Sequence, residues 1–190
     1  MKLFFMVLCA ALFSYCAAAR EVADASGRTF DFDAPPTAAT VVPNISQEVY
    51  AIGAQDFLLG NSNYCTYPED AKLKPKLGGL LNPDYEKIAK AAPEIFLLPL
   101  SPTGRAIARM LESGGVRPFF LNPEGLDNVS KDILLLGKVF FKDAAAEKIA
   151  RDFDAEIRDE RGRQTGRGRK ALFMFGNMAA GRGSFVGGLL

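Results

Sequence analysis

The stretch NPDYEKIAKAAPEIFLL, residues 82–98, joins a helix to a buried strand through a very short connection. Asn82 as N-cap, Pro83 at the first helical position and acidic side chains in the first turn predict that a helix begins here. The helix is expected to stop at Pro93, and the apolar run 94–98 is typical of a strand buried on both faces. Such a helix–strand unit predicts an α/β fold with a parallel sheet.

The same alternation continues on both sides of this stretch. Residues 27–33 alternate apolar and polar side chains, as an edge strand or hairpin does. Further strands are expected at residues 40–42, 57–60 and 116–121, and further helices at 46–54 and 103–113. We therefore expect residues 24–122 to form an N-terminal α/β lobe whose parallel sheet is covered by helices.

The pattern changes after this lobe. Residues 126–141 and 144–161 are helical with almost no break, and the second helix is amphipathic, so residues 126–163 are expected to form a rigid interlobe segment. A basic, glycine-rich linker follows at 161–169. Residues 170–190 are expected to begin a second α/β lobe, with a strand at 170–175 and a helix from Ser184, that the printed sequence leaves incomplete.

The first 19 residues read as a secretory signal peptide, with a basic start, an apolar run and an Ala-x-Ala end. The alternative of a membrane helix is disfavoured because the apolar run is shorter than the ~20 residues that span a bilayer. A second alternative is a lipoprotein with a lipid on Cys16, although Tyr15 stands where that processing prefers a small residue. Either way we expect a protein located in the periplasm or elsewhere outside the cytoplasm.

The composition excludes several classes of function. The chain has 23 basic and 22 acidic side chains, a net charge of only +1, so no strong charge draws it to nucleic acid or anionic lipid. It has no histidine, which excludes Ser-His-Asp and Cys-His hydrolases and removes the commonest zinc ligand. The glycine-rich run 181–187 lacks dinucleotide-binding spacing, and the arginines at 161–169 lack interleaved aromatic residues. We expect no catalytic residues, no metal site and no cofactor.

Five stretches in order resemble a known family: residues 27–42, 44–54, 63–68, 77–95 and 180–190. The family is that of ABC-transporter periplasmic binding proteins whose two α/β lobes are joined by a single long helix, which includes the cobalamin and iron–siderophore binders. The resemblance implies a ligand-binding N-terminal lobe, a bulky metal chelate (a corrinoid or ferric siderophore) held between lobes, and delivery to a membrane permease and its ATPase. It also implies a monomer that binds no nucleic acid, and that the printed chain, with one lobe, binds ligand weakly.

Ligand-facing loops in such a lobe follow the carboxyl ends of the strands. Tyr64 is the first candidate, because its ring and hydroxyl suit a corrin or a chelate; by resemblance it stands where cobalamin binders place a cleft tyrosine. Tyr67, Ser46, Leu80 and Ser101 are the further candidates. Leu80 falls where some relatives have a large aromatic residue, which counts against cobalamin itself. A half-buried structural role for Tyr64 and a haem ligand role for its phenolate are the alternatives.

Glu86 is the candidate for permease docking. It lies in the first turn of the helix at residue 82, off that helix's apolar face, and by resemblance it matches the first-lobe glutamate that meets permease arginines. The alternative is a carboxylate that only stabilises the helix N-terminus. Glu48, which resembles a family residue on the first helix, is interpreted as structural. A sensor or docking module outside transport remains a further alternative for the whole chain.

Overall fold

A four-stranded parallel sheet forms the centre of the computed structural model, which describes residues 19–122, 125–163, 174–175 and 178–179. Its strands, in spatial order, are β4 (Leu58–Gly60), β3 (Ala38–Thr40), β7 (Ile95–Pro99) and β8 (Arg117–Leu121). Every residue of β7 is buried, as its unbroken apolar sequence predicts for a central parallel strand. The predicted fold class is confirmed.

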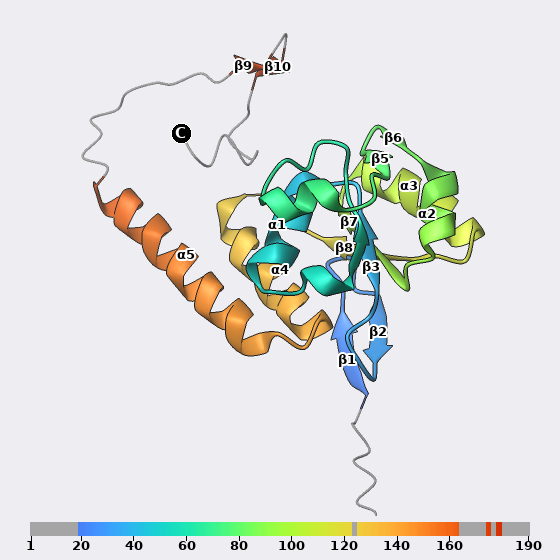
Figure 1. Cartoon of the computed structure of the whole chain (residues 1–190). Coiled ribbons are helices and arrows are strands. Elements are labelled where there is room, and N and C mark those ends of the chain that lie inside the picture. Colours follow the sequence, from blue (N-terminus) through green and yellow to red (C-terminus); the bar gives the residue numbers. More distant parts are fainter. Residues whose placement is uncertain (1–18, 123–124, 164–173, 176–177, 180–190) are drawn as a thin grey trace, which may run out of the picture.

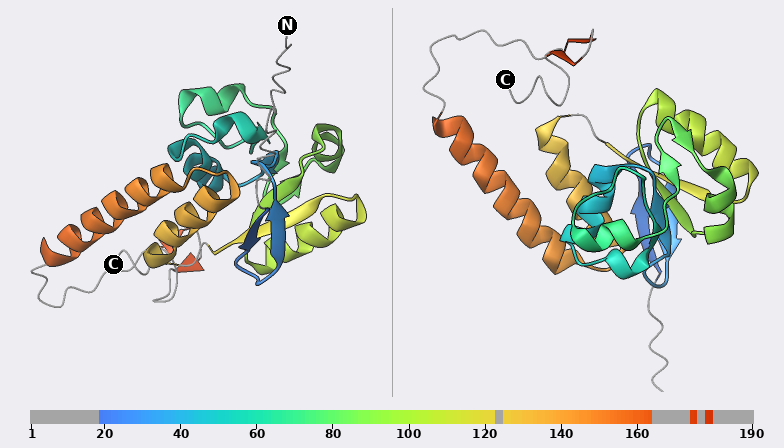
Figure 2. Two further views of the ribbon diagram at one scale, coloured as in Figure 1. Left: turned by 90° about the horizontal axis from the view of Figure 1, so that it is seen from below. Right: turned by 45° about the horizontal axis from the view of Figure 1, so that its top comes forward.

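Helices cover both faces of this sheet (Figures 1 and 2). The helices α1 (Pro43–Ala51), α4 (Leu126–Val139) and α5 (Asp143–Arg163) lie on one side, and α2 (Tyr85–Ala91) and α3 (Pro102–Ser113) lie on the other. Two short 3-10 helices, η1 (Gln55–Phe57) and η2 (Glu69–Leu73), flank β4. None of the helices in the described part of the chain is long and apolar enough to cross a membrane.

An antiparallel hairpin precedes the sheet. Its strands are β1 (Arg20–Ala23) and β2 (Thr29–Phe32), so its first strand lies before the residues 27–33 for which the sequence predicted a strand or hairpin. Asp24 fixes the turn, because its Oδ1 accepts hydrogen bonds from the backbone of Ser26 (2.8 Å) and Arg28 (3.0 Å). Its Oδ2 accepts one from the backbone of Phe120 in β8, at 3.1 Å, which ties the hairpin to the sheet.

Two predicted boundaries are wrong by a few residues around the first strand and helix. The strand expected at 40–42 is β3, which ends at Thr40, and the helix expected from Ser46 begins at Pro43. Val42 is extended and acts as N-cap, and proline fits the first helical position because its missing N–H has no partner there in any case. Thr40 lies in the sheet in both cases, and its hydroxyl donates to the Leu97 carbonyl at 2.9 Å.

The helix start predicted at Asn82 is also wrong. Asn82 and Pro83 form the short strand β6, which pairs with β5 (Gly78–Gly79), and α2 begins only at Tyr85. Asp84 is the N-cap, and its side chain accepts a hydrogen bond from the Lys87 backbone at 3.1 Å. The Asp84 backbone itself donates to the Leu77 carbonyl at 2.9 Å, so a contact with a preceding segment sets the helix start.

The two helices α4 and α5 form an antiparallel pair, joined by a tight turn at Phe140–Lys142 in which Phe141 has φ of 56°. Close packing at Gly137 and Ala146 brings the helices together next to the turn. An ion pair of 3.2 Å between Arg161 and Asp127 joins them at the other end. Helix α5 thus leads away from the sheet as a long arm (Figure 1).

Only part of the predicted second lobe falls within the described residues. There β9 (Met174–Phe175) pairs antiparallel with β10 (Met178–Ala179). The remainder of the strand expected at 170–175, most of the linker at 161–169, the helix expected from Ser184 and the signal peptide lie outside the described residues.

Candidate functional site

The carboxyl ends of the parallel strands meet at one edge of the sheet, as expected for this topology. The largest segment at that edge is the loop that follows β4, residues 61–77, which we call the β4 loop. It has no long helix or strand of its own, so its shape depends on hydrogen bonds within it.

Lys76 organises the interior of the β4 loop. Its ammonium donates to Asn61 Oδ1 (2.8 Å), to the Ala71 carbonyl (2.9 Å) and to the Cys65 carbonyl (3.3 Å). Asn61 is fully buried, and its amide nitrogen donates to the same Ala71 carbonyl at 2.8 Å. One cation therefore satisfies three acceptors from separate parts of the loop, and such charge-assisted bonds are the strong ones.

Backbone bonds close the β4 loop at its base. Asn61 donates to the Pro75 carbonyl and Leu77 donates back to the Asn61 carbonyl, both at 2.9 Å. Asn63 donates to the Gly78 carbonyl at 2.8 Å. The loop is therefore held in one shape by the protein alone.

Two tyrosines project from this ordered loop. The side chains of Tyr64 and Tyr67 are 67% and 69% exposed, although large aromatic residues are usually well buried. The Tyr64 ring rests on Gly79, where an added Cβ would lie only 2.7 Å from ring atom Cε2. Glycine at 79 thus allows the ring to lie against the backbone, which leaves aromatic surface available for a flat ligand.

The other predicted ligand contacts are placed differently. Leu80, next to Gly79, is partly buried and packs against the core. Ser101 is the N-cap of α3, and its hydroxyl accepts from the Gly104 backbone at 3.1 Å. Ser46 is fully buried, so its hydroxyl lies behind the surface that a ligand would touch.

Glu86 is exposed in the first turn of α2. The N-terminus of this helix is already capped by Asp84, which also forms an ion pair of 2.9 Å with Lys87. The hydrogen bonds and charge of Lys87 lower the pKa of Asp84. Capping therefore does not require Glu86, which is available for an external contact.

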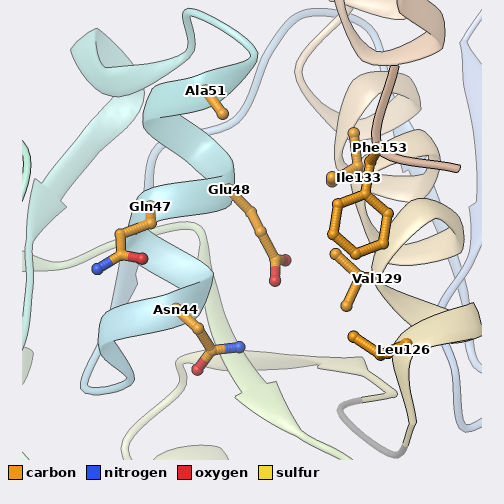
Figure 3. A pocket seen from close by; sticks show the side chains of 8 residues that line it. All are labelled: Asn44, Gln47, Glu48, Ala51, Leu126, Val129, Ile133 and Phe153. Atoms are coloured by element: carbon orange, nitrogen blue, oxygen red, sulfur yellow. The ribbon is translucent and has the colours of Figure 1, made fainter. Parts of the chain in front are cut away.

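A hollow lies between α1, α4 and α5 (Figure 3), and two of its lining residues, Gln47 and Ala51, also line a smaller hollow with Tyr67. We call the larger hollow the α1–α5 groove. It has a volume of about 560 Å³ and is lined by Asn44, Gln47, Glu48, Ala51, Leu126, Val129, Ile133 and Phe153. Figure 3 shows the Glu48 carboxylate pointing from α1 across this hollow toward the apolar side chains of α4 and α5.

Burial and a neighbouring carboxylate raise the pKa of Glu48. Removal from water is the larger cause and the charge of Asp132 the second, while a hydrogen bond with Asn44 opposes them; the resulting pKa is about 8. Among the residues that the structure describes, the buried oxygen Glu48 Oε2 has no hydrogen-bond partner. Burial also raises the pKa of Asp132 to about 6, although a hydrogen bond from the Asn122 backbone (3.0 Å) lowers it.

Sequence reasoning missed the α1–α5 groove. The signal was the spacing of Asn44, Glu48 and Ala51, which puts them on one face of a helix. Nothing in that spacing identifies α4 and α5 as the opposite wall. For metal binding, the described ranges contain no group of three or more Cys, Asp or Glu side chains that could hold an ion.

This geometry defines a class of protein: an α/β lobe with exposed aromatic side chains at the carboxyl edge of a parallel sheet, followed by a long helix that leads out of the lobe. The chain belongs to the periplasmic binding protein family, whose profile matches residues 39–190. The family predicted from sequence is confirmed.

Individual relatives are distant. The uncharacterized ABC transporter substrate-binding lipoprotein YvrC of Bacillus subtilis (strain 168) is 23% identical over 129 residues, which are 66% of this chain and 40% of that protein. The periplasmic vitamin B12 binding protein BtuF of Vibrio cholerae has a TM-score of 0.62 and 23% identity, over 70% of this chain and 52% of that one. The siderophore binding protein BauB has a TM-score of 0.73 and 20% identity, over 89% and 64%.

A periplasmic heme binding protein from Pseudomonas aeruginosa has a TM-score of 0.60 and 21% identity, over 67% of this chain and 46% of that one. At these identities the likeness to solved structures shows the fold. The chain spans 40% of the length of the curated relative and 52% of BtuF.

Proposed function

We propose that this chain is part of the solute-binding component of an ABC importer, and that it captures a bulky metal chelate outside the cytoplasm. The observation that carries the proposal is the pair of exposed tyrosines, Tyr64 and Tyr67, on the ordered β4 loop at the carboxyl edge of the sheet. Aromatic faces held in place lose little entropy when a flat or bulky ligand binds.

A corrinoid or a ferric siderophore is the class of cargo that this surface suits. Both present extended apolar surface with polar groups at the rim, which matches a tyrosine ring with its hydroxyl. The names of two similar structures, a vitamin B12 binding protein and a siderophore binding protein bound to a ferric iron complex, support the same class. Contacts from Leu80 and Ser101 would lie at the edge of this surface, and Ser46 would act only by supporting it.

Haem is the second candidate, because of the exposed phenol of Tyr64. A tyrosinate can hold haem iron, and this chain has no histidine that could do so. A heme binding protein from Pseudomonas aeruginosa is among the similar structures. In this case Tyr64 would act through its oxygen as well as its ring.

Delivery to a membrane permease and its ATPase completes the proposed function. The exposed Glu86 on α2 would meet basic side chains of the permease, which would orient the encounter more than it would add affinity. Export would depend on the signal peptide in residues 1–19. A lipid on Cys16 is an alternative that the lipoprotein name of YvrC favours.

Ligand titration of the protein with both lobes, followed by fluorescence, tests the proposal, because one lobe alone is expected to bind weakly. The chain has five tyrosines and no tryptophan, and cobalamin, cobinamide, haem and ferric siderophores absorb light strongly. We expect saturable quenching by one ligand of this panel. Tyr64→Ala should weaken binding about 5- to 150-fold, as loss of a stacked aromatic contact worth ~1–3 kcal/mol does.

The conservative variant Tyr64→Phe distinguishes between the candidate ligands. Tyr64→Phe should retain affinity for a corrinoid or siderophore, and should lose haem affinity together with the visible absorption of a tyrosinate–iron complex. Tyr85→Ala, at a tyrosine on α2 outside the β4 loop, is the control. If the folded protein binds no member of the panel, or if both alanine variants bind equally well, a role as a sensor or docking module replaces transport.

Permease docking needs a separate readout. Glu86→Gln should leave the fluorescence titration unchanged and lower ligand uptake by cells in which this chain is the sole copy. Unchanged uptake would remove Glu86 from the proposed interface.

A further inference from the structure

A hollow between the turn of the β1–β2 hairpin and α3 gathers basic side chains. We call it the arginine hollow, and it has a volume of about 190 Å³. Its charged lining residues are Arg28, Arg105, Arg109 and Glu112. Three cations thus accompany one carboxylate, although the whole chain has a net charge of only +1. The excess of positive charge is therefore a local feature of this hollow.

The carboxylate of the hollow is already bound. Glu112 Oε1 accepts a hydrogen bond of 2.7 Å from Arg28 on the hairpin, rather than one from Arg109 three positions earlier on α3. Arg105 lies over the ring of Phe120, with 5.8 Å between its guanidinium carbon and the ring centroid. Within the part of the chain that the structure describes, neither Arg105 nor Arg109 forms an ion pair or a side-chain hydrogen bond. Both exposed guanidinium groups therefore have N–H donors available.

The spacing of these two arginines favours an anion between them. Arg105 and Arg109 lie four positions apart on α3, so they share one face of the helix, where like charges destabilise it. A guanidinium presents its donors in a planar fork that fits a pair of oxygens, and a phosphate group has more acceptor oxygens than a carboxylate. We propose that the arginine hollow binds a phosphate group between Arg105 and Arg109, carried by a soluble phosphate compound or by a phospholipid headgroup.

The hollow is ordered by the protein alone. The buried Asp24 accepts hydrogen bonds from the Ser26 hydroxyl (2.7 Å) and from the Arg28 backbone (3.0 Å), which fixes the hairpin turn beside α3. A wall that is fixed beforehand loses little entropy when an anion binds. The volume lies below the ~300–1,000 Å³ of ordinary ligand pockets, so the hollow fits a phosphate group and excludes a bulky chelate. The site is therefore separate from the proposed cargo surface.

The first test is a titration of the full chain with inorganic phosphate at constant ionic strength, followed by the backbone amide NMR signals of α3 and the hairpin turn. We expect saturable shifts of these signals, and no such shifts with acetate. Arg105→Gln with Arg109→Gln should weaken phosphate binding at least about tenfold, because it removes charge-assisted hydrogen bonds of ~1.5–3 kcal/mol each.

The matched control removes the same charge from another helix. Arg151→Gln with Arg158→Gln changes two exposed arginines of α5 and should leave phosphate binding unchanged. The proposal would be overturned by an equal loss in both double variants, or by equal shifts with acetate.

The second test distinguishes the two sources of the phosphate group. Flotation with vesicles of phosphatidylcholine and phosphatidylglycerol is compared with flotation on phosphatidylcholine alone. Binding to the anionic vesicles that is lost in the α3 double variant and retained in the α5 double variant would assign the site to a lipid headgroup. Saturable phosphate binding without vesicle binding would assign it to a soluble phosphate compound. Binding to neither, or vesicle binding that falls equally in both double variants without a phosphate response, would overturn the proposal.

Discussion

Gly137 on α4 and Ala146 on α5 determine how closely the two helices approach next to their turn. A Cβ added at Gly137 would overlap the Cβ of Ala146, which is completely buried. The same glycine accepts a backbone hydrogen bond from Lys142 at 2.8 Å, so it cannot move away without disturbing the turn. We therefore expect Gly137→Ala to destabilise the protein, although alanine is the better helix former.

The magnitude is the difference between two effects. Replacing glycine by alanine inside a helix contributes about 1 kcal/mol of stability. Overpacking a close contact costs about 1–3 kcal/mol, and here the clash falls on a rigid methyl group next to backbone, so the upper part of that range applies. The expected net loss is about 1–2 kcal/mol in the free energy of unfolding, measured by urea denaturation, or a decrease in Tm of about 3–8 °C.

Two further variants distinguish this clash from other causes. In Gly137→Ala with Ala146→Gly the methyl group is moved to the other helix, and the stability should return to within about 1 kcal/mol of the native value, well above the sum of the single changes. Gly162→Ala, with nothing within 4 Å of the added Cβ on α5, should stabilise or be neutral. A Gly137→Ala protein as stable as the native one, or no recovery in the double variant, would refute this account of the helix crossing.

Three further predictions concern the edge of the sheet. Burial raises the Asp132 pKa from its ordinary value of 3.8 to about 6, so native Asp132 retains its proton over a range where the unfolded form has lost it. Stability should therefore fall as pH rises between about 4 and 6, and Asp132→Asn should flatten this dependence in urea denaturation. Lys76→Met removes three hydrogen bonds and should accelerate amide exchange throughout the β4 loop, whereas Lys74→Met should not. Gly79→Ala should displace the ring of Tyr64, shift its NMR signals and weaken ligand quenching severalfold; unchanged ring signals would contradict the contact seen here.

The local sequence pattern predicted which helices and strands form more accurately than the residues at which they begin and end. The apolar run of β7 and the periodicity of α3, α4 and α5 were recognised because each is repeated over many residues. Judged by the local sequence alone, Asn82 as N-cap and Pro83 at the first helical position predicted a helix start. Pairing with Gly78 and Gly79 placed them in a strand instead, and such pairing depends on backbone contacts that the local sequence does not express.

The candidate site residues also fall into two groups: those whose position the local sequence predicted and those whose role depends on tertiary contacts. The position of Tyr64 and Tyr67 after a strand was sufficient to expect them at the carboxyl edge of the sheet, and the structure exposes both; their contact with ligand stays a prediction. The roles of the two serines were not predictable, because the same hydroxyl can face a ligand, cap a helix as Ser101 does, or be buried as Ser46 is. The fate of a small polar side chain depends on its neighbours in space.

The sequence by itself determined the α/β class and the order of the elements, because hydrophobic periodicity and turn residues act over a few neighbouring positions. The family followed from the resemblance of five stretches of the sequence to known binding proteins. Only the tertiary structure decided that Lys76 orders the β4 loop, that Gly79 supports Tyr64, and that Glu48 faces an apolar groove. The physical reason is that burial and electrostatic environment are collective properties. The pKa of Glu48 depends on the α4 residue Asp132 and on removal from water beside α4 and α5, helices that begin more than 70 positions later in the chain.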